Sequence, residues 1–517
     1  MAHSSERSGA EGASPGLDRR KFLQGLASGA LAYAGANQRS LAGDRPGQAA
    51  AAKEVFKTRG YYLGLQRMPD FGLEEWKAIL RCIKEDRGNY LILWMGGAFR
   101  SRKFPITWQY NRDHLNIQHD FVRQLIDYAH SLGIKVVLGF TPFGYDGVNQ
   151  YPIEHPELKA TQQSGDLHRL WGIHSWGYIL CPSQAESQRF ILEYVSELYF
   201  EFYPNADGIM IESSDYGVCY CPDCRGHYYE REFKFVQAIS ERIWRKSPGA
   251  EIVVYPQYFV ATGNPGSEEA APAKYDPRWT LFFTFHSTPL VKDLVKMAPN
   301  SIQYESFPYL TAQDVRTTMQ KMRDFGVNGI APSLECFSFR ARYPEGNYWQ
   351  AMGRKYKPFG YEWLRPGQHP YDALLTRVWR LAFREFGANP DLPWDDFRTI
   401  LGKELFAGSA PSSAVDDLIE WQKIFMTDPS WWAPSPIVSP ELFSWRTELG
   451  QFKALQLEEY RAMLSRLRQI RAKYHSPSRN PNLQEMLEAL DYILAKWNGH
   501  EDVLKAPRYL AQREGPR

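Results

Sequence analysis

The chain has 517 residues, and its 61 Lys and Arg against 59 Asp and Glu give a formal net charge of +2. This balance argues against a nucleic-acid binder that relies on overall positive charge. With 23% charged and 15% aromatic residues the chain is not largely disordered, and it contains no run of about 18 apolar residues that would span a membrane. The 16 Trp, 30 Tyr and 29 Phe residues suit either a large aromatic core or platforms that stack on sugar rings.

Residues 1–57 are predicted to be an export signal and a linker. The pair Arg19-Arg20 precedes Phe22 and Leu23, and a short, weakly apolar stretch follows at 25–36. The pattern resembles a bacterial twin-arginine signal. This resemblance implies export of the folded protein by the twin-arginine machinery to the periplasm or the medium. The mature protein is expected to lack a transmembrane segment.

Apolar runs alternate with amphipathic segments over residues 58–365. Eight apolar runs have the length of buried strands, at 61–65, 90–94, 135–140, 207–212, 251–255, 281–286, 302–305 and 329–335. Helical spacing occurs between many of them, at 73–85, 117–132, 184–202, 228–245 and 311–325. Such alternation predicts parallel strands joined by right-handed crossovers. Eight units predict an α/β fold of the (β/α)8 TIM-barrel type. A doubly wound open sheet is the alternative, weakened because no Gly-rich phosphate loop follows the first strand.

The strand signals stop near residue 370, and only helical patterns follow. Helices are expected at 371–386, 394–405, 415–425, 449–474 and 483–497. The sequence therefore predicts a helical C-terminal domain, residues 366–517, packed on a catalytic barrel at 58–365.

Three glutamates end predicted strands, where a TIM barrel carries its chemistry. Glu212, Glu305 and Glu335 each follow apolar residues that are expected to be buried. Because a buried carboxylate loses hydration, each should either pair with another group or take part in the reaction. Two carboxylates flanking a sugar ring are the minimal apparatus for cleaving a glycosidic bond. We expect Glu212 to be the general acid, and Glu305 or Glu335 to be the nucleophile or base. Salt bridges to arginines near the barrel mouth are the structural alternative.

Other side chains near strand ends are expected to bind substrate. Asp215 could position the sugar or tune Glu212, and His286 could orient a glutamate or simply lie in the core. Cations after two strands, if they reach the same mouth, would favour an acidic sugar. They could instead pair with protein carboxylates. The expected substrate-binding set is Asp215, Trp94, Tyr216, Tyr255, His286, Tyr304 and Arg340, and the cations are Arg100, Arg102, Lys103, Arg340 and Arg342.

A cysteine-rich loop begins seven residues after Glu212. Cys219, Cys221, Cys224 and His227 offer four ligands, as a tetrahedral structural zinc site needs. A Cys219–Cys224 disulfide and free thiols are the two alternatives. A catalytic metal is not expected, because four protein ligands leave no open position. The remaining cysteines, Cys82, Cys181 and Cys336, are predicted to be ordinary buried thiols.

The segment DGIMIESSDYGVCYCPDC, preceded by Leu180-Cys181-Pro182-Ser183, resembles TIM-barrel glycoside hydrolases related to α-glucuronidases and β-N-acetylhexosaminidases. That resemblance implies a glutamate acid on a middle strand and carboxylates on later strands, roles that Glu212, Glu305 and Glu335 would fill by position. Ile211 stands before Glu212 where the hexosaminidases carry an Asp, which puts substrate-assisted hydrolysis in doubt.

The favoured function is a secreted glycoside hydrolase that acts on an oligo- or polysaccharide and requires no cofactor. Two alternatives belong to other classes: a barrel that binds carbohydrate without cleaving it, and another barrel hydrolase or lyase, with or without assistance from a metal. A barrel that only binds carbohydrate would need the aromatic residues but not three glutamates at strand ends. No nucleic-acid partner is expected.

Overall fold

The computed structural model describes residues 55–112, 114–145, 147–170, 177–212, 218–255, 275–283, 294–296, 298, 300–303, 310–333, 368–407, 410–426 and 457–502. With the exception of Gln368, these residues belong to one compact unit that spans Lys53–Leu364 and His369–Arg517.

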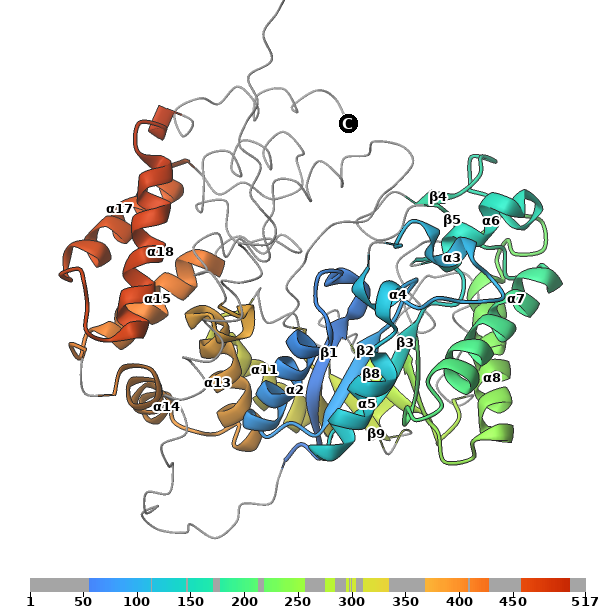
Figure 1. Ribbon diagram of the computed structural model, residues 1–517, viewed down its shortest axis with the longest axis horizontal. Coiled ribbons are helices and arrows are strands. Elements are labelled where there is room, and N and C mark those ends of the chain that lie inside the picture. The colour runs from blue at the N-terminus through green and yellow to red at the C-terminus, as the bar shows by residue number, and fades with distance from the viewer. Residues whose placement is uncertain are drawn as a thin grey trace, which may run out of the picture. The chain divides into compact units, whose positions relative to one another are not determined.

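Eight parallel strands close into a barrel (Figure 1). Their order around the barrel is β1-β10-β9-β8-β7-β6-β3-β2, so β1 pairs with β2 on one side and with β10 on the other. This closure confirms the predicted TIM barrel and excludes an open doubly wound sheet, which would leave two free edges. The strands are β1 (Thr58–Gly64), β2 (Tyr90–Trp94), β3 (Lys135–Phe140), β6 (Gly208–Glu212), β7 (Glu251–Tyr255), β8 (Thr280–Phe283), β9 (Asn300–Gln303) and β10 (Gly329–Ile330).

The strands are apolar on both faces because both faces are buried. One set of side chains points outward and packs against the helices, as Leu91 and Leu93 of β2 do. The alternate set, such as Tyr90, Ile92 and Trp94, fills the barrel interior together with residues from six of the other strands and with Ala331, which directly follows β10. This two-sided burial explains why the eight strands appear in the sequence as short, nearly continuous apolar runs.

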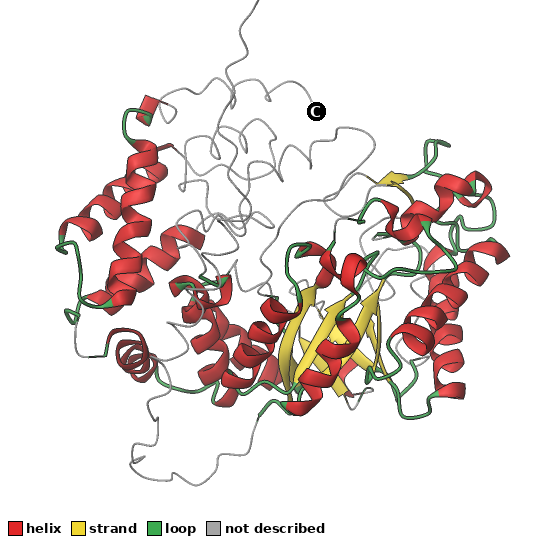
Figure 2. Cartoon of the chain, viewed as in Figure 1, coloured by secondary structure: helices red, strands yellow, loops and turns green. Residues whose placement is uncertain are grey.

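Amphipathic helices surround the strands (Figure 2). In α2, for example, Trp76, Ile79, Leu80 and Ile83 lie on the buried face, as the helical spacing predicts. Five helices follow strands of the barrel in chain order: α2 (Leu73–Glu85), α5 (Val122–Ser131), α7 (Ala185–Ser196), α8 (Tyr228–Lys246) and α11 (Ala312–Phe325).

The helix expected at 117–132 is divided by Asp120 into α4 (Leu115–His119) and α5. Asp120 has φ +42°, in the left-handed region, which Asp tolerates better than most residues. Asn116 Oδ1 accepts a hydrogen bond from the Phe121 N–H (3.0 Å), and the Tyr203 hydroxyl donates to Asp120 Oδ1 (2.8 Å). Side chains therefore satisfy the backbone and stabilise the interruption.

Further short elements occur in the loops. The helix predicted at 184–202 is found as α7 followed by a π-helical segment, η4 (Glu197–Phe202). The others are η1 (Leu65–Arg67), α3 (Ile106–Gln109), η2 (Val148–Gln150), α6 (Tyr151–Glu154), η3 (Pro156–Leu158), and the two-stranded sheet of β4 (Arg169–Leu170) and β5 (Gly177–Tyr178).

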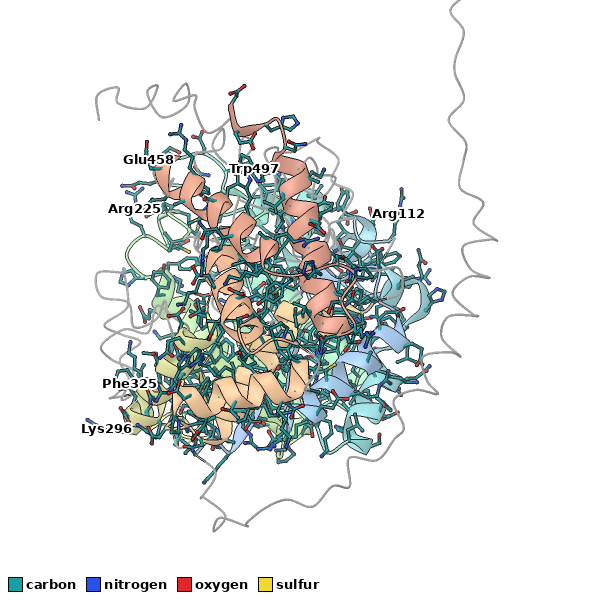
Figure 3. The ribbon with its side chains drawn as sticks, turned by 90° about the vertical axis from the view of Figure 1, so that its left-hand side faces the viewer. Arg112, Arg225, Lys296, Phe325, Glu458 and Trp497 are labelled. Atoms are coloured by element: carbon teal, nitrogen blue, oxygen red, sulfur yellow. The ribbon has the colours of Figure 1, made fainter. Side chains whose placement is uncertain are left out.

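Only helices follow the barrel among the described residues. Glu458 near the start of α17 and Trp497 at the end of α18 lie on neighbouring helices (Figure 3). None of the described helices combines the length and apolarity needed to cross a bilayer. The helical elements are η8 (Pro370–Asp372), α13 (Leu374–Ala388), α14 (Trp394–Leu401), η9 (Gly402–Phe406), α15 (Ala414–Met426), α17 (Leu457–Ala472) and α18 (Pro481–Trp497).

A buried ion pair fastens α13 to the barrel. Arg380 Nε donates to Asp86 Oδ2 (2.8 Å) at the end of α2, and the Tyr61 hydroxyl of β1 donates to the same oxygen (2.9 Å). Burial raises the pKa of Asp86 to about 6, even though Arg380 and the two hydrogen bonds favour its charged form. The C-terminal helices and the barrel therefore share one continuous core, with charges inside it.

His114 provides a test of this buried interior at mildly acidic pH. Burial lowers the pKa of His114 to about 4, because the hydrogen bond of its Nε2 with the Gln66 carbonyl oxygen (2.9 Å) only partly offsets lost hydration. In the unfolded chain the pKa is about 6.5, so below that pH the unfolded state takes up a proton that the folded state excludes. We expect this residue alone to lower the free energy of unfolding by about 2 kcal/mol between pH 7 and pH 5.

The measurement is urea unfolding of the wild type and of His114→Gln at both pH values. The substitution keeps a side-chain donor and removes the titration, so its unfolding free energy should fall about 2 kcal/mol less than that of the wild type. Parallel pH dependences of the two proteins would contradict this account of His114.

Candidate active site

Glu212 is the last residue of β6, at the end of the barrel where TIM-barrel enzymes carry their active sites. It pairs in register with Tyr255, the last residue of β7. Met210, two residues earlier, belongs to the interior cluster, so the alternation of the strand directs Glu212 inward as well. Glu212 is half-buried.

Tyr62 of β1 holds this carboxyl group. Its hydroxyl donates to Glu212 Oε2 (2.8 Å) across the barrel. The Tyr62 ring is itself buried and is stacked on Trp94 (6.1 Å between centroids) and tilted against Phe282 (5.6 Å). A donor fixed by packing on two sides can restrict the orientation of the carboxyl group. Tyr62 was not among the predicted site residues. Its inward orientation could have been inferred from the alternation along β1, which places positions 60, 62 and 64 on one face.

The structure places the predicted residues Trp94 and Tyr255 in the same interior cluster as Tyr62. Trp94 is 1% exposed and Tyr255 is 7% exposed, so they present little ring surface and mainly support the residues around Glu212. Gly139 of β3 makes room for the indole, since a Cβ there would lie 3.1 Å from Trp94 Cδ1. Tyr145, in the left-handed region at φ +57°, meets the indole edge-on (6.3 Å).

Most of the other predicted site residues lie outside the described part of the chain. In the sequence, Glu305 follows the end of β9 by two residues and Glu335 follows the end of β10 by five. The residues outside the described ranges are Asp215, Tyr216, His286, Tyr304, Glu305, Glu335, Arg340 and Arg342.

The cations after β2 all contact protein groups. Arg102 Nη2 lies 2.8 Å from Glu201 Oε2, and Lys103 Nζ lies 2.6 Å from Glu201 Oε1. The hydrogen bond from Lys103, with the charges of both cations, lowers the pKa of Glu201. The Arg100 guanidinium lies over the Trp108 ring (5.3 Å). The alternative of pairing with protein carboxylates therefore holds for Arg102 and Lys103.

Cys181, which was predicted to be an ordinary buried thiol, lies among the three cysteines of the loop after Glu212. Cys181 Sγ lies 3.6 Å from Cys219 Sγ and 3.7 Å from both Cys221 Sγ and Cys224 Sγ. The thiols of Cys219 and Cys224, directed at Cys181, lower the pKa of Cys181. All four cysteines are free thiols here, without a Cys219–Cys224 disulfide. Cys181 is therefore a buried thiol, as predicted, but it lies within the cysteine cluster and not apart from it.

His227 does not join this cluster, so the predicted ligand set is corrected. The sulfur atoms of Cys181, Cys219, Cys221 and Cys224 lie within 4.8 Å of one another and form a group that could hold a metal ion. His227 instead precedes the first turn of α8, where its exposed imidazole faces Glu230 (Nδ1 to Oε2, 3.4 Å).

Protein-family models and curated protein sequences both give no match to the chain. Among solved structures, it is similar to a GH138 enzyme targeting pectin rhamnogalacturonan II, with a TM-score of 0.51 and 14% identity over 89% of this chain. The chain spans only 60% of that enzyme's length. A β-N-acetylhexosaminidase from Bacteroides fragilis gives a TM-score of 0.46 and 14% identity over 68% of this chain and 71% of that one. An O-GlcNAc hydrolase mutant from Thermobaculum terrenum gives a TM-score of 0.46 and 12% identity, covering 87% of this chain and 83% of that one. The similarity to the GH138 enzyme shows a shared fold, and all three neighbours are glycoside hydrolases.

Proposed function

We propose that the protein is a glycoside hydrolase in which Glu212 is the general acid. The observation that carries the proposal is the position of Glu212: it ends β6, points into the barrel mouth and accepts a hydrogen bond from Tyr62 (2.8 Å). The similar fold of the GH138 enzyme supports cleavage of a glycosidic bond as the reaction. A protonated Glu212 would donate to the glycosidic oxygen as the bond breaks, and the leaving sugar would depart as an alcohol.

A second carboxylate must act on the opposite side of the sugar ring. Glu305 and Glu335 are the candidates, because they follow β9 and β10 in the sequence. Around the closed barrel, β9 is three strands from β6 and β10 is four strands from it, directly across. A carboxylate after either strand would approach a substrate from the side facing Glu212. As a nucleophile it would form a glycosyl-enzyme intermediate, and as a base it would activate water.

The test is a screen of the purified full-length protein on aryl glycosides and polysaccharides. Released reducing ends report hydrolysis, and calorimetric titration with the same sugars reports binding. Turnover of one glycoside class supports the proposal, and proton NMR of the first product then separates retention from inversion of the anomeric centre. Saturable sugar binding without turnover would instead establish a carbohydrate-binding barrel.

We also propose that the protein is exported by the twin-arginine route to the periplasm or the medium. Support comes from Arg19-Arg20 followed by Phe22 and Leu23 in the sequence. Replacing both arginines with lysine should leave the full-length precursor in the cytoplasm, as measured by immunoblotting of cell fractions. The unchanged sequence in a strain lacking the twin-arginine translocase is the matched control, and export in either case would refute the route.

A further inference from the structure

We propose that Cys181, Cys219, Cys221 and Cys224 bind one Zn²⁺ ion through their four sulfur atoms. A tetrahedral zinc site with zinc–sulfur distances of about 2.3 Å has sulfur–sulfur edges of about 3.8 Å. Three edges of the cluster measure 3.6, 3.7 and 3.7 Å. A single ion at the centre would therefore require little rearrangement of the four side chains, whereas a disulfide would need two sulfur atoms at about 2.05 Å.

The surroundings of the cluster suit a closed thiolate site. Cys181, Cys219 and Cys224 are at most 2% exposed. The Thr161 N–H donates to Cys219 Sγ (3.4 Å), and Ser183 Oγ lies 3.0 Å from Cys181 Sγ. Four thiolates around a divalent cation leave a net negative charge, which such donors stabilise. Soft sulfur ligands in tetrahedral number favour zinc over the oxygen-seeking cations Mg²⁺ and Ca²⁺.

The backbone already forms the turn that a Cys-x-x-Cys ligand pair needs. The N–H groups of Cys224 and Arg225 both donate to the Cys221 carbonyl oxygen (3.0 and 2.9 Å), which brings the sulfurs of Cys221 and Cys224 to the same side. Arg225, the next residue, projects away from this loop (Figure 3). The backbone of the Cys221–Cys224 pair therefore has the conformation needed for metal binding in the absence of a metal.

The ion would join segments that are distant in the sequence. Cys181 lies before α7, and its N–H donates to the Leu158 carbonyl oxygen (2.8 Å). The Tyr220 N–H, between two of the ligands, donates to the Thr161 carbonyl oxygen (2.7 Å). The loops that follow β3 and β6 would thus be cross-linked on the face of the barrel where catalysis occurs in this fold.

The cross-link would also anchor the loop that leaves Glu212. β6 fixes one end of this loop, and the metal would fix the other end at Cys219, seven residues later. Because four sulfurs fill the coordination shell, the ion supplies structure and no reactive water. The role in positioning Glu212 rests on the proposed function, whereas the metal site itself does not.

The experiment measures metal content in the full-length protein purified without chelators. Mass spectrometry of the metals should find about one zinc per chain. Cys181→Ser should weaken zinc binding at least about 100-fold, since only three sulfurs remain. His227→Ala and Cys82→Ser are the matched controls, and both should retain zinc, because neither side chain belongs to the cluster.

Replacement of zinc by Co²⁺ gives a readout that does not depend on any variant folding. The wild-type cobalt protein should show thiolate-to-cobalt charge-transfer absorption and the intense visible bands of tetrahedral coordination, and His227→Ala should leave both unchanged. A wild type without zinc that shows no such bands would overturn the site, as would full zinc retention in Cys181→Ser. Iron in stoichiometric amount would overturn zinc as the ion that the four cysteines bind. None of these readouts needs hydrolysis, so failure of the zinc site and failure of the glycosidase proposal are distinguishable.

Discussion

Glu212→Gln is expected to lower kcat on a natural glycoside by about 10²–10⁴-fold. Glutamine fits the same space and can still contact Tyr62, whose hydroxyl lies 2.8 Å from Glu212 Oε2, but it cannot deliver a proton to the glycosidic oxygen. Sugar binding should change little, because the loss falls on the transition state. The measurement is steady-state kinetics combined with calorimetric titration of the same substrate.

The leaving group tells the acid from the nucleophile. A dinitrophenolate departs without a proton, whereas a sugar alkoxide needs one. If Glu212 is the acid, the variant should therefore be strongly impaired on a disaccharide and much less impaired in glycosylation from a dinitrophenyl glycoside. An equal, large loss on both substrates would make Glu212 the nucleophile or the base. Unchanged turnover would remove it from the reaction altogether.

A matched control is available on the outside of the barrel. Glu201 lies on η4 and pairs with Arg102 and Lys103. Glu201→Gln makes the same chemical change at an ion pair that is partly exposed, where the expected cost is about 0–1 kcal/mol of stability. Its kcat should match that of the wild type, so a general effect of Glu→Gln substitution can be separated from the loss at Glu212.

The barrel could be predicted because each strand is buried on both faces and so forms an apolar run. The runs at 90–94 and 135–140 correspond residue for residue to β2 and β3. The break at Asp120 could not be predicted, because part of its support comes from Tyr203, which is 83 residues away. Helical periodicity continues through the interruption and carries no sign of it.

The sequence predicts a site residue where that residue directly follows one strand, but it does not predict which distant residues contact it. Glu212 follows directly from its place after an apolar run, but its partner Tyr62 is 150 residues away and becomes visible only when the barrel closes. Cys181 was missed for the same reason, since 38 residues separate it from Cys219. His227 is the histidine nearest to the three clustered cysteines in the sequence, whereas Cys181 stands just before a different predicted helix.

The last expected result concerns stability. Arg380→Met should lower the free energy of unfolding by about 3–5 kcal/mol near pH 8, because it leaves the Asp86 carboxylate buried without its cation. Asp86 is 4% exposed and would keep only the hydrogen bond from Tyr61. Since removal of Arg380 raises the pKa of Asp86 above its wild-type value of about 6, protonation should relieve part of the loss. The destabilisation relative to the wild type should therefore shrink as the pH falls from 8 toward 5, as measured by guanidinium chloride unfolding.

The double substitution Asp86→Asn with Arg380→Met isolates the buried charge. It removes both charges and keeps an acceptor for the Tyr61 hydroxyl, so it should recover much of the stability that Arg380→Met loses. Arg398→Met is the control, because Arg398 pairs with Asp395 and Asp416 at the surface, where about 0–1 kcal/mol is expected. If Arg380→Met costs no more than Arg398→Met, and its cost does not depend on pH, then the ion pair does not fasten α13 to the barrel, and apolar packing alone must hold the C-terminal helices in place.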